Sequence, residues 1–374
     1  MEILSTNENE CCQNSYEVKR IRDKGSRRFY IPCRYLVTLI EFFAFSEINA
    51  YRIATSISLV AMVNNSAIDS PKTSNVTIVS CPLNTSESES YSGSENKGEF
   101  DWSPALQGYI LSAGFLGYFL TPIPGGRLAE TYGAKPTVVL GLLISSTGHL
   151  LSPLAAWSSV YLLIVIQTLR GIGQGLITSG HSVLAAKWFP RPERGLLNTL
   201  TWSGFAVGAL TSGVTAGSMC SSSFLGGWPS VYYVQGSLGL LLCLCAQVFL
   251  FESPKVHPRI SAGEKEFILQ NQESDLSRKR PPTPWIKMLT SIKVYAMIFG
   301  IFGQFWTITH FLAVQPIFLG TILRFSVKEN GFLASIPFVF QAMNGYLGSG
   351  ISKWLNTHNY VGVDKARKGC NLFG

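Results

Sequence analysis

Two arginines of this chain lie inside long apolar stretches, where a charge is rare and costly. Arg52 lies well inside the apolar block 35–63, and Glu47 precedes it by five residues. A charged side chain at the centre of a membrane helix costs about 2.5–3.5 kcal/mol and usually marks a function. Arg52 could therefore face an internal cavity and attract an anion. It could instead reach the interface or pair with an intramembrane glutamate, and the sequence leaves this structural alternative open.

Further polar side chains accompany Arg52 in later apolar blocks. Arg170 and Gln174 lie one helical turn apart in block 160–186, so they share a helix face. An arginine beside an amide suits a carboxylate or a phosphate. In block 294–323, Gln304 and His310 are the polar candidates, and His310 could relay a proton or simply hydrogen-bond a neighbouring helix. These five residues form the predicted substrate and ion site.

The elements that must position these residues are eight apolar blocks, each long enough to cross a bilayer as a helix. They span residues 35–63, 106–123, 136–156, 160–186, 196–219, 229–251, 294–323 and 331–355. Charged residues make up only 14% of the chain, against about 25% in soluble proteins. Because the blocks are continuous rather than alternating, strands are excluded as the spanning element. The sequence predicts an all-α integral membrane protein that contacts lipid.

The basic residues lie in alternate segments between the blocks, as cytosolic loops require. They fill the N-terminal arm 1–34, the segments after the second, fourth and sixth blocks, and the stretch beyond the eighth. Both termini are therefore predicted to be cytosolic. This distribution also explains the net charge of +8 without a nucleic-acid partner.

The first segment on the opposite side, 66–103, is polar and predicted to be a lumenal loop. Asn64, Asn75 and Asn84 each begin an Asn-X-Ser/Thr triplet in or beside it. Three acceptors in the one region already assigned to the lumen predict a glycosylated protein.

The sequence lacks the signatures of other functional classes. It contains no phosphate-binding loop, nucleophile elbow or clustered catalytic acids, so an enzyme is not expected. No metal site or cofactor is predicted either, apart from a coupling ion, H⁺ or Na⁺.

A short motif separates the second and third blocks. Residues 124–135 read P-G-G-R-L-A-E-T-Y-G-A-K. Two adjacent glycines permit a close turn, an acid precedes the next helix, and a base lies at the cytosolic surface. The pattern G-x-L-A-E-x-x-G-x-K, which contains Gly126, Glu130, Gly133 and Lys135, resembles the loop 2–3 signature of the major facilitator superfamily.

Other segments resemble one branch of that superfamily, the anion transporters that include sialin, the vesicular glutamate transporters and the type I sodium–phosphate transporters. They are GYFLTPIPGG, GGWPSVYYVQG, ILRFSVKENGFLASIPF and AAKWFPRPERG, the last containing the loop 4–5 pair Glu193 and Arg194. The resemblance runs from about residue 34 to residue 374. Arg52 matches the family's helix 1 arginine. Gln174 stands where proton-coupled members have glutamate and the sodium–phosphate branch has glutamine.

The resemblance implies a carrier of twelve helices that alternates between two faces of the membrane. Residues 35–251 would form the complete N-terminal six-helix bundle, 252–293 the cytosolic central loop, and 294–374 helices 7 and 8 of the second bundle. The chain is therefore expected to be truncated after helix 8.

Two functions follow from the resemblance. The first is ion-coupled transport of a small organic or inorganic anion, such as sialic acid, glutamate, urate or phosphate, in the plasma membrane or a lysosomal or vesicular membrane. The alternative is a truncated, non-transporting isoform or a regulatory partner of a full-length carrier.

The predicted topology can be tested by glycosidase treatment. An N-glycosidase should lower the apparent mass of the expressed protein, because the acceptors are predicted to face the lumen. Replacing Asn64, Asn75 and Asn84 together should abolish that shift. A tag at Met1 should become reachable only after permeabilisation, and a tag reachable on intact cells would overturn the orientation.

Overall fold

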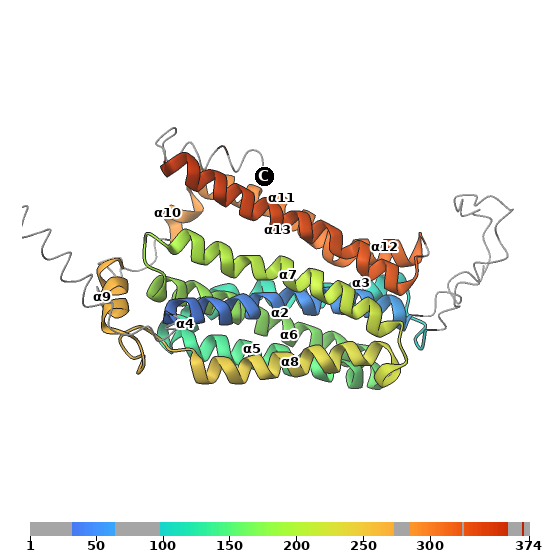
Figure 1. Ribbon diagram of the computed structural model, residues 1–374. Helices are drawn as coiled ribbons and strands as arrows, with labels where there is room; N and C mark the ends of the chain where they lie inside the picture. Colours follow the sequence, from blue (N-terminus) through green and yellow to red (C-terminus); the bar gives the residue numbers. More distant parts are fainter. Residues whose placement is uncertain (1–31, 64–97, 273–284, 324, 358–368, 370–374) are drawn as a thin grey trace, which may run out of the picture.

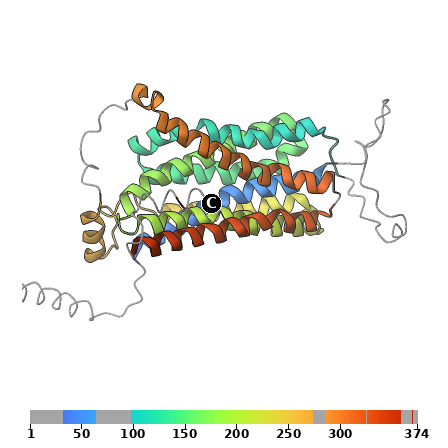
Figure 2. The same ribbon diagram turned by 90° about the horizontal axis from the view of Figure 1, so that it is seen from above.

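The computed structural model describes residues 32–63, 98–272, 285–323, 325–357 and 369. All regular structure among these residues is helical, and one isolated bridge joins Val63 to Phe100. Figures 1 and 2 show the long helices lying side by side with roughly parallel axes. Asn64, Asn75, Asn84 and most of the predicted lumenal loop lie outside the described residues.

Six long helices form the first part of the fold. They are α2 (Cys33–Met62), α3 (Pro104–Leu120), α5 (Ala134–Ser158), α6 (Val160–Trp188), α7 (Arg194–Cys220) and α8 (Trp228–Phe249). Short connections accompany them, namely α4 (Pro122–Thr131) and a 3₁₀ turn at Phe224–Gly226.

The second part continues with shorter and longer helices. They are α9 (Ala262–Gln270), α10 (Trp285–Leu289), α11 (Ile292–Thr309), α12 (Gln315–Thr321) and α13 (Val327–Thr357). The first six predicted apolar blocks fall on helices α2 to α8, and the last two fall on α11 to α13. Part of the predicted central loop 252–293 forms α9.

Length and composition alone make four of the described helical segments fit to cross a membrane. They are α5, α6, α8 and the continuous stretch Ile292–Thr321. Helices α2, α7 and α13 have 30, 27 and 31 residues and are long enough, but they contain more polar residues. In α2 those polar residues include the buried Glu41, Glu47 and Arg52.

Helix starts follow the local sequence. The Ser103 side chain accepts a hydrogen bond from the backbone N–H of Leu106 at the start of α3, and Ser261 does the same for Glu264 in α9. Both are serine caps that satisfy an otherwise unpaired donor. Ser159 caps α6 in a similar way, and Pro104 occupies the first turn of α3, where its missing N–H costs nothing.

Helix α2 is enclosed by its neighbours and passes through the middle of the bundle. It packs against α7, α8 and α6, and most of its residues are buried. The contact with α7 is a direct backbone contact, since a Cβ at Gly208 would lie 1.9 Å from the Ser46 carbonyl oxygen. Helices α3 and α6 meet similarly at Gly114 and Gly171. Such small residues allow membrane helices to approach closely.

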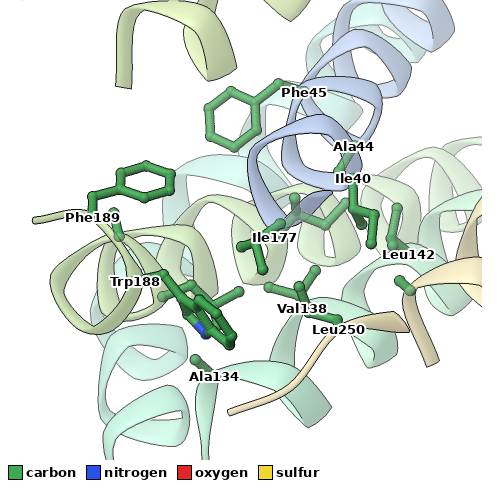
Figure 3. Close-up of a cluster of buried hydrophobic side chains, with 14 of the residues drawn as sticks. Ile40, Ala44, Phe45, Ala134, Val138, Leu142, Ile177, Trp188, Phe189 and Leu250 are labelled. Carbon is green, nitrogen blue, oxygen red and sulfur yellow. The ribbon is translucent and has the colours of Figure 1, made fainter. Parts of the chain in front are cut away.

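One end of this bundle is closed by an apolar cluster. Figure 3 shows Ile40, Ala44 and Phe45 from α2 facing side chains of α5 and α6. The other labelled members are Ala134, Val138, Leu142, Ile177, Trp188, Phe189 and Leu250. The Trp188 indole also donates a hydrogen bond to the Phe251 carbonyl, which ties the end of α6 to the segment after α8.

Helices α12 and α13 pack on the first part of the fold, whereas α11 is more exposed. Helix α13 lies along α7, and a Cβ at Gly213 would lie 2.8 Å from the Gly331 carbonyl oxygen. In α11, none of the described residues is buried. Between α11 and α12 the predicted continuous helix contains a π-helical turn at His310–Val314. Pro316 follows, and it has no N–H for regular pairing.

The prediction of a close turn at the two adjacent glycines of the loop 2–3 motif is wrong. Gly125 and Gly126 lie inside the helix α4, which follows α3 almost directly. The chain turns at Gly133, whose φ of 112° is a conformation that glycine adopts readily. The turn therefore requires glycine at residue 133 of the motif, and not at residues 125 and 126.

The backbone contact between α2 and α7 can be tested with one methyl group. Gly208→Ala should lower the melting temperature of the purified protein, because overpacking typically costs about 1–3 kcal/mol. Gly300→Ala in α11 is the matched control, since nothing lies within 4 Å of its Cβ position. Equal melting temperatures for both variants would contradict the packing described here.

Candidate functional site

A small cavity lies where α2, α3, α6 and the π-helical turn meet. The cavity is narrow, with a volume of about 10 Å³. The lining residues are Arg52, Thr55, Leu111, Gly114, Phe115, Arg170, Leu312 and Ala313. In this conformation the cavity holds no more than about one water molecule. Both parts of the fold contribute to its wall.

Arg52 enters this cavity from α2 and is held by an amide and two aromatic rings. Its Nε donates to Gln174 Oε1 at 3.2 Å. Its guanidinium carbon lies 4.9 Å from the centre of the Phe115 ring and 4.7 Å from that of Tyr118. The aromatic faces attract the cation without neutralising it. The Nη2 of Arg52 is buried and has no hydrogen-bond partner.

Arg170 enters the same cavity from α6. Its Nη1 donates to the Tyr51 carbonyl oxygen at 2.8 Å and to Thr55 Oγ1 at 3.0 Å. Its Nε is buried without a partner. The predicted trio of Arg52, Arg170 and Gln174 is therefore brought together by helices α2 and α6.

Neither arginine forms an ion pair with any of the described residues. Glu41 is paired instead with His181, whose Nδ1 lies 3.1 Å away. Glu47 accepts a hydrogen bond from Ser146. The structure thus does not show the glutamate pair that would make Arg52 a purely structural charge. Two buried cations without a carboxylate, each with an unpartnered N–H, suit an anion that accepts charge-assisted hydrogen bonds.

The structure does not bring Gln304 and His310 to this site. Both side chains are exposed, and neither lines the cavity. Gln304 lies on α11, in which none of the described residues is buried, and His310 is the first residue of the π-helical turn. The neighbours of His310 in the π-helical turn, Leu312 and Ala313, reach the cavity instead.

His149 occupies a position that the sequence did not indicate. It is fully buried. Its ring stacks on Tyr51 at 3.8 Å between centroids, with Tyr232 on another side at 4.8 Å. Tyr51 thus contacts both groups, through its ring to His149 and through its backbone carbonyl to Arg170. No local pattern indicates the position of His149, because that position depends on contacts with Tyr51 and Tyr232, which are far away in the sequence.

The loop 2–3 motif meets a glutamate that the sequence reasoning missed. Glu252 Oε2 accepts from the backbone N–H of Lys135 at 2.9 Å, and a Cβ at Gly133 would lie 2.9 Å from the same oxygen. Glu252 also pairs with Lys187. Burial raises the pKa of the Glu252 carboxyl, but hydrogen bonds from Lys187, Lys135 and Ala134 outweigh this and hold it below its usual range. Gly126 has open space around its Cβ position, and Glu130 is exposed on α4.

The loop 4–5 motif joins a second ionic group at the same end of the bundle. Glu193 Oε2 accepts from Arg34 Nε at 2.8 Å. Glu264 of α9 accepts from the backbone N–H groups of Cys33 and Arg34 at 3.0 and 3.1 Å. Arg194 begins α7. These contacts fasten the start of α2 to the segments before α7 and after α8.

Comparison with known proteins identifies the family of this chain. Residues 52–363 match the family model described as Major Facilitator Superfamily. The chain belongs to this superfamily. It is therefore an integral membrane protein that crosses the bilayer several times, and its relatives are transporters, not enzymes, as the sequence predicts.

Two mouse relatives illustrate the similarity. Sodium-dependent phosphate transport protein 3 is 32% identical over 92% of this chain and 71% of its own length. Sodium-dependent phosphate transport protein 1 is 33% identical over 90% of this chain and 69% of its own length. The predicted resemblance to the anion transporters is thus confirmed. This chain spans about two thirds of the length of such relatives.

Solved structures agree on the fold. A D-xylose–proton symporter superposes with a TM-score of 0.57 at 15% identity, covering 84% of this chain and 68% of its own. An inward-facing bacterial homologue of the human lysosomal transporter Spinster gives 0.55 at 18% identity, covering 89% and 64%. These similarities show the major facilitator fold.

The ionic contacts of Glu252 should make stability depend on acidity. A lowered folded-state pKa contributes stability that is present above the unfolded pKa, near 4.3, and is lost as the pH falls through the folded value. Glu252→Gln should therefore lower the melting temperature at neutral pH, and the difference from wild type should shrink below about pH 4. Glu266→Gln, at an exposed glutamate of α9, is the control. A difference that persists unchanged in acid would contradict this account.

Proposed function

We propose that the chain is a secondary carrier of a small anion, of the organic or inorganic kind that phosphate represents. The observation that supports this most strongly is the pair of buried guanidinium groups, Arg52 and Arg170, without a described acidic partner. A phosphate or carboxylate oxygen could accept from Arg52 Nη2 and Arg170 Nε, which are buried and unpartnered. The printed names of the two mouse relatives are consistent with phosphate.

The geometry also suggests how such a carrier would alternate. The cavity is too small for an anion in this conformation, so an anion could bind between the arginines only after part of the wall moves. Leu312 and Ala313 belong to the π-helical turn, whereas the arginines belong to the first six helices. Movement of that turn away from α2 would open the arginine pair on one side. Rocking of two helix bundles about a central site would supply this motion.

The remaining parts of the proposal follow the sequence. The arm 1–34 and the central loop 252–293 would face the cytosol, and 35–251 and 294–374 would contribute the two bundles. The membrane would be the plasma membrane or a lysosomal or vesicular membrane. Transport would be coupled to Na⁺ or H⁺, and the sodium dependence in the relatives' names favours Na⁺.

Uptake into proteoliposomes tests the proposal. The purified chain should accumulate labelled phosphate or a competing organic anion saturably. Arg52→Gln should reduce uptake by about 30-fold or more, because losing one member of a buried charge pair costs about 2–5 kcal/mol. Arg52→Lys should lose most of it, since lysine keeps the charge but not the planar fork.

Arg191→Gln provides the matched control, because it removes the same charge from an exposed position. Its uptake should equal that of wild type. Normal uptake by Arg52→Gln would make Arg52 structural and leave Arg170 as the anion's partner. An absence of uptake by the wild-type chain, alone in the liposome, would favour the non-transporting regulatory partner.

A further inference from the structure

A surface of different chemistry lies at the start of α11, outside the anion cavity. The short helix α10 precedes α11, and only Thr290 and Ser291 separate the two. The apolar span that begins at Ile292 is long enough to cross the membrane. Its first residue therefore marks one edge of the hydrocarbon core, and α10 lies beside that edge, at the level of the lipid headgroups. Figure 1 shows α10 at the same end of the bundle as α9.

Apolar side chains project from α10 and from the start of α11 with little cover from the described residues. The exposed fractions are 80% for Ile286, 64% for Leu289 and 83% for Ile292. Tyr295, about one helical turn after Ile292, is also exposed. Lipid tails cover apolar side chains of this kind, and tyrosine is enriched at the interface between membrane and water. Segment 286–295 therefore suits the boundary between lipid tails and headgroups.

The same segment carries positive charge that the described residues do not neutralise. Lys287 and Lys293 are exposed, and neither pairs with a carboxylate in the described part of the chain. By contrast, Lys187 of α6 pairs with Glu252. Three further bases precede α10 in the sequence, namely Arg278, Lys279 and Arg280. No Asp or Glu occurs from residue 276 to residue 328, so this stretch of the chain has positive charge without an acid of its own.

We propose that Ile286, Lys287, Leu289, Ile292 and Lys293 form a docking surface for an anionic phospholipid. The two lysines bind the negative headgroup through charge-assisted hydrogen bonds. The three apolar side chains pack against the upper part of the acyl chains. Clusters of Lys and Arg directly beside a membrane helix are typical of surfaces that bind the anionic lipids of the cytosolic leaflet.

The combination of side chains favours a lipid over a soluble anion. A soluble anion gains nothing from Ile286, Leu289 and Ile292, whereas a lipid contacts these side chains and the lysines at once. Lysine is a compact charge on a flexible stem, so its ammonium group can follow a headgroup while its methylene groups stay on apolar surface. The cytosolic position proposed for the central loop would place this surface in the leaflet that contains most anionic lipid.

Helix α11 connects this surface to the anion cavity. It leads directly into the π-helical turn, whose Leu312 and Ala313 line the cavity. A lipid bound at Lys287 and Lys293 holds the start of α11 at the membrane surface, and thus fixes one end of the helix next to the turn that moves in the proposed transport cycle. This regulatory consequence rests on the proposed function, whereas lipid binding itself does not.

Lipid binding can be measured without any transport. The full chain is purified in detergent, dioleoyl phosphatidylserine or dioleoyl phosphatidylcholine is added, and native mass spectrometry measures the bound lipid. Wild type should bind phosphatidylserine about tenfold more tightly or better. Replacing Lys287 and Lys293 together with glutamine should weaken phosphatidylserine binding by about 30-fold, because each base near a membrane surface contributes about a fivefold preference for anionic lipid.

Two further double variants test the charge and the apolar contact separately. Lys255→Gln with Arg259→Gln is the matched control, because it removes the same charge from exposed positions of the same central loop. It should bind phosphatidylserine as wild type does. Ile286→Ser with Leu289→Ser should weaken phosphatidylserine binding but leave the melting temperature nearly unchanged, since both side chains are exposed.

The outcomes separate a docked lipid from general charge attraction and from a soluble anion. Equal weakening by the two glutamine double variants would overturn the proposal, because net charge alone would then attract the lipid. Equal binding of the two lipids by wild type would overturn it as well. Glycerophosphoserine, the headgroup without acyl chains, should compete weakly, and competition as strong as that of the lipid would assign the lysines to a soluble anion instead. A failure of anion uptake would leave a measured lipid preference intact.

Discussion

Two like charges buried side by side are the constraint on which the rest of this fold depends. Arg52 and Arg170 repel each other and have both left water, yet the described part of the chain gives neither a carboxylate. Their neighbours compensate only in part, through the Gln174 amide, the Tyr51 carbonyl and aromatic faces. An arrangement of this kind persists only when rigid helices hold the arginines in place.

That rigidity comes from close backbone contacts and from ionic fastening at one end. Gly208 and Gly171 remove the side chains that would separate α2 from α7 and α3 from α6. At the end where α2 begins, Glu264 and Glu193 hold Arg34 and its backbone, and Glu252 holds the turn after α4. These contacts at the helix surfaces and at one end of the bundle hold the helices in place, so the interior can keep its buried polar side chains. Helix α2 carries both Arg52 and the buried Glu47, so the same contacts hold both side chains in place.

The sequence predicted the helices, and the structure brings together three of the five predicted site residues, Arg52, Arg170 and Gln174. Arg52 stood out because a charge within an apolar block is expensive, and Arg170 with Gln174 because their spacing defines one helix face. Gln304 and His310 are also polar residues within an apolar block, yet both side chains are exposed, because α11 packs little against the other helices and this packing follows from no local pattern. Likewise His149 and Glu252 acquire their roles only through partners far away in sequence, Tyr51 and Lys135. The apolar pattern of a sequence predicts where a helix lies, but it does not predict which other helix it packs against.

The π-helical turn at His310–Val314 has an evolutionary consequence. The Ala313 carbonyl oxygen accepts a hydrogen bond from Ser56 Oγ of α2 at 3.2 Å. A backbone acceptor belongs to every amino acid, so a substitution at residue 313 that keeps the helical backbone leaves this acceptor in place and changes only the side chain at the cavity. The amino-acid identity on which this hydrogen bond depends is therefore that of Ser56, since Ala313 contributes only its backbone. Side-chain changes at residue 313 would thus alter the shape of the cavity without removing this contact between the two parts of the chain.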